Sequence, residues 1–125
     1  MSDRSSADRD ETTPASTHGD SLDDSPAGDD PDAVLDALFA TIENRKAELP
    51  EESYTTSLFT HEKGENAVLE KLGEESTELI LAAKDDDLDD LRYESADFLY
   101  HLLVLFSMKE LTVDDLRDEL ESRFQ

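Results

Sequence analysis

Large apolar residues recur three and four positions apart in four stretches of this chain, which is the spacing of a helix with one buried side. The first stretch covers residues 31–48 and opens on Pro31, a residue that suits a first helical turn. The others cover about 64–84, 88–108 and 112–124. Strand-like alternation and hairpin dipeptides do not occur in the sequence. The pattern predicts an all-α fold, a helical bundle of about four helices per chain.

Each predicted helix has an expected packing side. On the second helix, the small residues Gly73 and Ser76 lie on the apolar side, where another helix could approach closely. The third is apolar on nearly every side after Ala96, which is typical of a central helix covered by neighbours or by a second subunit. Residues 51–63 lack a sustained period and are predicted to form a connecting loop. The positions expected to pack are Leu35, Leu38, Phe39 and Ile42 on the first helix, Leu69, Leu72, Leu79, Ile80 and Ala83 on the second, and Val113, Leu116, Leu120 and Phe124 on the last.

Residues 1–30 lack this pattern. They hold nine acidic residues, two arginines and almost no large apolar side chain, which is too little burial to offset chain entropy. We therefore predict a disordered acidic tail at 1–30 and one all-α domain at 31–125. The absence of cysteine excludes thiol chemistry, and the longest apolar run, 98–108, is too short to span a bilayer. The chain is expected to be cytoplasmic and to make no membrane contact.

The formal net charge is −23, from 34 acidic and 11 basic residues. Such a charge opposes binding to a phosphate backbone, so a nucleic acid is excluded as a partner. High salt would screen the self-repulsion of so many carboxylates. The charge therefore indicates a halophilic source, and an acidic protein from an ordinary cytoplasm is the alternative.

Two groups of carboxylates lie inside the apolar helices. Glu74, Glu75 and Glu78 share one side of the second helix, and Glu94 and Asp97 share one side of the third. A charged carboxylate in a partly buried helical side is costly unless something compensates it, and a divalent cation between two facing helices would do so. Hard oxygen ligands favour magnesium or manganese over zinc. Because magnesium usually completes its shell with substrate phosphates, a phosphorylated substrate is expected.

Acidic residues make up more than a quarter of the chain, so such groups also arise by chance on solvated helix sides. Glu94 and Asp97 fit that explanation poorly, since they head an almost wholly apolar helix. His101 shares their stripe, although a histidine there is more often a hydrogen-bonded core or interface residue than a ligand.

Other polar residues near these groups are candidates for substrate contacts. Lys71 and Lys84 could contact phosphate, or could form ordinary ion pairs along a helix. Tyr54 and Thr55 could hold a sugar or a phosphate, or could belong to a plain loop of hydroxyl residues.

Several motifs follow one another between residues 42 and 123. They are Ser53-Tyr54-Thr55 with Leu58-Phe59, Lys71-x-Gly73-Glu74-Glu75-x-Thr77-Glu78, Ala82-Ala83-Lys84, Glu94-x-Ala96-Asp97 and Tyr100-His101-Leu102-Leu103-Val104-Leu105. In combination they resemble the phosphoribosyl-ATP pyrophosphatase family of histidine biosynthesis. The two carboxylate motifs alone would indicate only the wider group of all-α nucleotide pyrophosphatases that includes the MazG proteins.

The resemblance implies magnesium-dependent hydrolysis of the α–β phosphate bond of phosphoribosyl-ATP, with phosphoribosyl-AMP and pyrophosphate as products. It also implies a homodimer packed around the long third helix. Glu75, Glu78, Glu94 and Asp97 would bind the metal. Glu75 and Glu78 would also belong to the catalytic residues together with Glu74, an accessory ligand or base.

Two other functions remain open from the sequence. A MazG-like pyrophosphatase would share the metal chemistry and act on ordinary nucleoside triphosphates. A non-catalytic acidic helical dimer would use its carboxylates for solubility alone.

Overall fold

The computed structural model describes residues 30–124, and every regular element in that part of the chain is helical. This confirms the predicted all-α class. The four predicted helices correspond to α3, α5, α6 and α7, while the predicted acidic tail lies almost entirely outside the described residues. The elements are η1 (Pro31–Ala33), α3 (Val34–Glu48), α4 (Tyr54–Phe59), α5 (Glu65–Lys84), α6 (Leu88–Met108) and α7 (Val113–Glu121).

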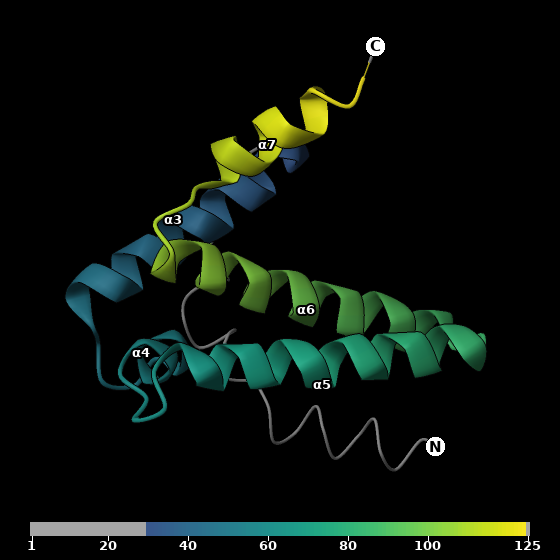
Figure 1. Cartoon of the computed structure of the whole chain (residues 1–125), viewed down its shortest axis with the longest axis horizontal. Coiled ribbons are helices and arrows are strands. Elements are labelled where there is room, and N and C mark those ends of the chain that lie inside the picture. The colour runs from purple at the N-terminus through teal and green to yellow at the C-terminus, as the bar shows by residue number, and fades with distance from the viewer. Residues whose placement is uncertain (1–29, 125) are drawn as a thin grey trace.

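Helices α5 and α6 form a long antiparallel hairpin (Figure 1). A tight turn joins them, in which Asp87 N donates to Ala82 O and Asp86 N donates to Ala83 O. Asp86 adopts the left-handed conformation that ends many helices, with φ of 56°. Asp87 then caps α6, because its carboxylate accepts from Asp90 N at 3.1 Å. This short turn fixes which residues of α5 face which residues of α6.

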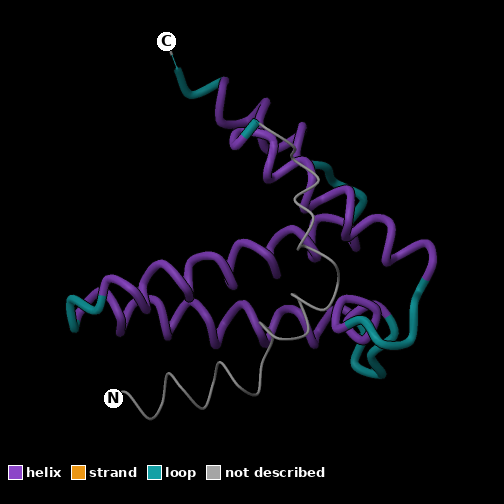
Figure 2. The backbone as a smooth tube through the Cα atoms, turned by 180° about the vertical axis from the view of Figure 1, so that it is seen from behind, coloured by secondary structure: helices purple, strands orange, loops and turns teal. Residues whose placement is uncertain are grey.

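Helix α3 crosses the C-terminal part of α6, and α7 lies side by side with α3 (Figures 1 and 2). Thr112 begins α7 with a capping box to Asp115. Across residues 30–124, none of the helices combines the length and apolar character of a membrane span. The core lies where α3, α4, α5, α6 and the start of α7 meet. It consists of Phe39, Ile42, Leu58, Val68, Tyr100, Leu103, Val104 and Val113.

The predicted loop at 51–63 is wrong in its centre, where α4 forms. Ser53 starts this helix, because its hydroxyl oxygen accepts from Thr56 N at 3.2 Å. Threonine and tyrosine are modest helix formers, so local propensity gave no reason to expect a helix here. Burial of Thr55, Thr56 and Leu58 stabilises the helix instead, so tertiary packing overrides local propensity here.

The side of α5 that packs inside the chain agrees only in part with the predicted one, since Leu72 and Leu79 are partly buried and Leu72 packs against the core. Val68, Glu75 and Ala82, seven residues apart, are buried against α6. Of the predicted packing residues, Leu69 and Ile80 remain 42% and 58% exposed. We call the stripe of Leu69, Gly73, Ile80 and Ala83 the uncovered stripe, and a Cβ built at Gly73 meets nothing within 4 Å.

The packing side predicted for α7 is also only half correct. Val113 is buried and Leu116 is partly buried, whereas Leu120 and Phe124 are 52% and 81% exposed. The reason is geometric: the end of α7 extends away from the α5–α6 hairpin (Figure 1), and α3 is the helix with which α7 makes its main contacts.

Candidate functional site

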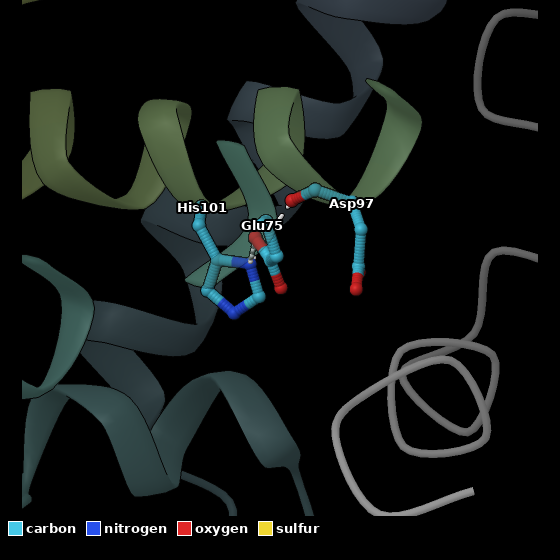
Figure 3. A group of neighbouring side chains, drawn as sticks. All are labelled: Glu75, Asp97 and His101. Carbon is cyan, nitrogen blue, oxygen red and sulfur yellow. Dashed lines mark hydrogen bonds and ion pairs between the residues drawn. The ribbon is translucent and has the colours of Figure 1, made fainter. Parts of the chain in front are cut away.

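Glu75 is the centre of the candidate site. Glu75 is 3% exposed and lies on the side of α5 that packs against α6. Figure 3 shows its carboxylate beside the His101 ring and near Asp97, both carried by α6. Ligand atoms of Glu75, Asp97 and His101 all lie within 4.8 Å of one another. The antiparallel hairpin thus brings together one carboxylate from each of the two sequence motifs.

His101 is fully buried and uses both ring nitrogens. Its Nδ1 lies 3.0 Å from the backbone carbonyl oxygen of Asp97 and 2.8 Å from Oε1 of Glu75. Its Nε2 lies 3.0 Å from the hydroxyl of Tyr54, which α4 carries. The histidine therefore connects α4 to the carboxylate at the centre of the site.

Burial shifts the pKa values of these groups in opposite directions. Burial raises the pKa of Glu75 to about 7, although a contact with the Asp97 side chain and the charge of Lys71 oppose the shift. Burial lowers the pKa of His101 to about 4 and raises that of Tyr54 above its usual range. At neutral pH the imidazole is therefore neutral.

These shifts make opposite contributions to stability. Folding raises the pKa of Glu75, so lowering the pH from 7 to 4.5 increases the free energy of unfolding. Folding lowers the pKa of His101, so lowering the pH from 6.5 to 4 decreases that free energy. Each full shift corresponds to on the order of 3 kcal/mol, and the two largely offset each other in the intact pair.

Single substitutions should separate the two contributions. We expect Glu75→Gln to lose stability relative to the unmodified chain as the pH falls from 6.5 to 4, because only the histidine effect remains. We expect His101→Asn to gain stability relative to the unmodified chain as the pH falls from 7 to 4.5, because only the glutamate effect remains. Urea unfolding at a fixed KCl concentration with a chelator measures both effects. Protonation of the other carboxylates as the pH falls reduces the negative charge of all three chains alike. Parallel pH profiles would contradict the assignment.

The residues of this site suit a divalent cation. Both Glu75 oxygens are buried, and within residues 30–124 no donor reaches either one with good hydrogen-bond geometry. The contact with Asp97 becomes a hydrogen bond only when one of the two carboxyl groups keeps a proton. A cation that replaced this proton would compensate both carboxylates, and hard oxygen donors suit magnesium or manganese.

The other predicted metal ligands extend this site along the two helices. Glu78 is partly buried one turn after Glu75, and Glu94 is 2% exposed one turn before Asp97. Among the described residues, neither belongs to a group of three ligand atoms as close as that of Glu75. Their assignment as metal ligands remains a prediction.

Lys71 and Glu74 lie at the edge of the site. The Lys71 side chain is 16% exposed, and its Nζ lies 3.8 Å from Oε1 of Glu74 and 4.0 Å from Oε2 of Glu75. The Glu74 side chain is 65% exposed. The lysine thus reaches both the buried carboxylate and the solvent.

The remaining predicted residues lie at different distances from the centre. Thr55 is buried and its hydroxyl pairs with the hydroxyl of Tyr100, while Tyr54 is partly exposed. Lys84 is exposed at the end of α5, nine residues after Glu75 and so about 14 Å along the helix axis. Substrate contacts by these residues remain predictions.

A hollow of about 360 Å³ opens beside the site, between α4 and α5. Ser57 and His61 line it although neither was among the predicted site residues, because a short helix without a clear period gave no reason to align them with α5. Its lining consists of Tyr54, Ser57, Leu58, His61, Ala67, Glu70, Lys71 and Glu74. Tyr54 and Lys71 therefore border both this hollow and the buried carboxylate group.

Comparison with known proteins gives a consistent match. A profile of the phosphoribosyl-ATP pyrophosphohydrolase family matches residues 35–124. Phosphoribosyl-ATP pyrophosphatase of Haloarcula marismortui is 74% identical over 95 residues, which are 76% of this chain and 97% of that protein. The enzyme of the same name from Haloquadratum walsbyi is 61% identical over 93 residues, 74% of this chain and 93% of that protein. Histidine biosynthesis bifunctional protein HisIE of Halalkalibacterium halodurans is 49% identical over 90 residues, 72% of this chain and 42% of that protein.

Proposed function

This chain belongs to the phosphoribosyl-ATP pyrophosphohydrolase family, and we propose that it hydrolyses phosphoribosyl-ATP to phosphoribosyl-AMP and pyrophosphate in histidine biosynthesis. We further propose that the reaction depends on magnesium, or on manganese in its place. The observation that carries the metal proposal is the buried Glu75 carboxylate, which faces Asp97 across the α5–α6 hairpin. In this assignment Glu75, Glu78, Glu94 and Asp97 bind the cation.

The side chains of the site suit hydrolysis of a phosphoric anhydride. Bound at the carboxylates, magnesium would neutralise charge on the phosphate oxygens and lower the pKa of the attacking water. Glu74, exposed next to the buried group, would accept a proton from the attacking water or serve as an accessory ligand. Lys71 contacts a phosphate oxygen from the border of the hollow. Tyr54 is proposed to contact the sugar or phosphate from the other border.

A direct assay tests this function. The purified full-length chain is incubated at high KCl concentration with magnesium and with phosphoribosyl-ATP, ATP or dUTP. We expect pyrophosphate release from phosphoribosyl-ATP, and none after the cation is chelated. Release from ATP or dUTP alone would favour the MazG-like alternative. No release from any of them would favour the non-catalytic alternative.

The working environment follows from the charge. A net charge of −23 repels itself at low ionic strength, and salt screens this repulsion. The similar enzymes of Haloarcula marismortui and Haloquadratum walsbyi come from halophilic archaea. We propose that this chain works in the cytoplasm of a cell with high internal salt.

We also propose that two copies pair through the uncovered stripe of α5. The stripe combines exposed aliphatic side chains with Gly73 and Ala83, which permit a close approach of another helix. Leu88, next to the α5–α6 turn, is 70% exposed and would add apolar area. Exposed apolar groups on neighbouring turns of one helix are typical of an interaction surface.

Ile80→Lys should convert the dimer to a monomer, because the substitution introduces a charge at the centre of the apolar contact. It lowers the net negative charge, so added repulsion between the copies would not explain a loss of pairing. Leu120→Lys, at a 52% exposed position of α7 outside the stripe, is the control and should remain dimeric. Sedimentation equilibrium at high KCl measures the mass. An unchanged dimer mass for Ile80→Lys would refute this interface.

A further inference from the structure

His101 is a buried titratable residue without a role in the proposed mechanism. It lies on α6 with 0% exposure, and its ring packs edge-on against two tyrosines. The ring centroids of His101 and Tyr54 are 5.9 Å apart at 87°, and those of His101 and Tyr100 are 4.8 Å apart at 75°. These contacts hold the plane of the imidazole, so its nitrogens point in defined directions.

The partners of the two nitrogens determine where the single proton lies. Nδ1 faces the Asp97 carbonyl at 3.0 Å, and a carbonyl oxygen only accepts. Nδ1 therefore carries the hydrogen in the neutral ring. Nε2 is then an acceptor, and the Tyr54 hydroxyl donates to it at 3.0 Å. All three groups use their hydrogens consistently in this arrangement.

The Nδ1–H group of the neutral ring also lies next to the Glu75 carboxylate. Oε1 of Glu75 is 2.8 Å away, off the line of the hydrogen bond to Asp97 but within its electrostatic reach. The partial positive charge of the N–H attracts this oxygen and limits its rotation. One imidazole thus touches the backbone of Asp97 and the side chain of Glu75, one predicted ligand from each helix.

We propose that His101, anchored on the Asp97 backbone carbonyl, is a positioning residue that orients the Glu75 carboxylate for the cation and does not itself bind it, with Tyr54 fixing the tautomer. The activity part of this inference depends on the proposed function. Direct ligation through Nδ1 would require loss of its hydrogen. The lone pair of Nδ1 would then lie 3.0 Å from the Asp97 carbonyl oxygen, so that two acceptors would face each other without a hydrogen between them. Ligation through Nε2 would require loss of the Tyr54 hydrogen bond. A second contact that orients a metal-binding carboxylate is typically worth about 10- to 100-fold in metal affinity or activity.

The tautomer provides a test that is independent of activity. Long-range ¹H–¹⁵N spectra of the ¹⁵N-labelled full-length chain distinguish Nδ1–H from Nε2–H, and the signals lost in His101→Asn identify His101 among the three histidines of the chain. We expect the Nδ1–H form both without and with saturating magnesium. A change to the Nε2–H form when magnesium is added would mean that Nδ1 binds the metal, and a shifted Nε2 signal with Nδ1–H retained would mean that Nε2 binds it. Either result would overturn the inference.

Two substitutions at His101 test the positioning role in catalysis. His101→Leu removes the donor, and we expect about a 10- to 100-fold loss in both magnesium affinity and kcat, with KM changed little. His101→Asn keeps an N–H near the position of Nδ1, and we expect it to recover most of the loss. Equal defects in both folded variants would overturn the inference.

If a His101 variant fails to fold, the tautomer spectra still test the inference, because the signals lost in His18→Asn and in His61→Asn identify those of His101 by elimination. If that chain releases no pyrophosphate from phosphoribosyl-ATP, the proposed function fails while the tautomer and the magnesium affinity still decide the role of His101.

Discussion

Glu75→Gln should lower kcat for phosphoribosyl-ATP on the order of 10²- to 10³-fold, because it removes a buried charge that would compensate the cation and, through it, the phosphates. Asp97→Asn should have a similar effect, since Asp97 is the α6 carboxylate whose ligand atom lies within 4.8 Å of those of Glu75 and His101. The measurements are steady-state pyrophosphate release and magnesium affinity by calorimetry. Retention of full activity by both variants would remove the carboxylate pair from the mechanism.

The same substitution separates loss of function from loss of fold. Glu75 is buried with a raised pKa, so its ionised form destabilises the chain when no cation is present. We expect Glu75→Gln to be inactive and yet more stable to urea than the unmodified chain at pH 8 with a chelator. Glu119→Gln is the matched control, because its carboxylate is exposed on α7 and pairs only with Arg123 among the described contacts. It should change neither activity nor stability appreciably.

Leu103→Ala should destabilise the domain by about 2–5 kcal/mol, the usual range for removing a leucine from a packed core. Leu103 is 1% exposed on α6 and belongs to the core shared with α3 and α5. Because small domains are only marginally stable, this loss is a large share of the total. Urea unfolding at constant high KCl measures it.

The control for this core substitution is Leu120→Ala, at a position that is half exposed on α7. We expect a change within about 0.5 kcal/mol for this variant, as for most surface substitutions. Similar losses for both variants would mean that Leu103 is not part of a close-packed core.

The carboxylate site was predictable in part from the sequence. Spacing placed Glu75 and Asp97 each on one side of a helix, and the structure brings these two residues together across the hairpin. The spacing of the apolar residues places Glu75 nearer than Glu74 to the apolar stripe of α5, and the structure buries Glu75 and leaves Glu74 largely exposed. How deeply Glu75 is buried depends on the rotation of α5 about its axis relative to α6, which a single helical pattern does not contain.

The role of His101 required the fold. From sequence alone it was a core or interface histidine on the stripe of Glu94 and Asp97. Its hydrogen-bond partner Tyr54 is 47 positions away and lies on α4, a helix that the local pattern did not predict. The contact exists because α4, which packs against α3 and α5, places the Tyr54 hydroxyl beside His101 of α6.

The sequence by itself determined the helices α3, α5, α6 and α7, the acidic charge and the hard oxygen character of the site. These properties depend on residues three and four apart, on capping side chains such as Thr112, and on composition, all of which are local. Only the tertiary structure decided that α4 forms, that Val68, Glu75 and Ala82 face α6, and that Ile80 does not. The physical reason is that a helix with apolar residues on several sides can bury any of them, and the side it buries depends on what the rest of the chain packs against it.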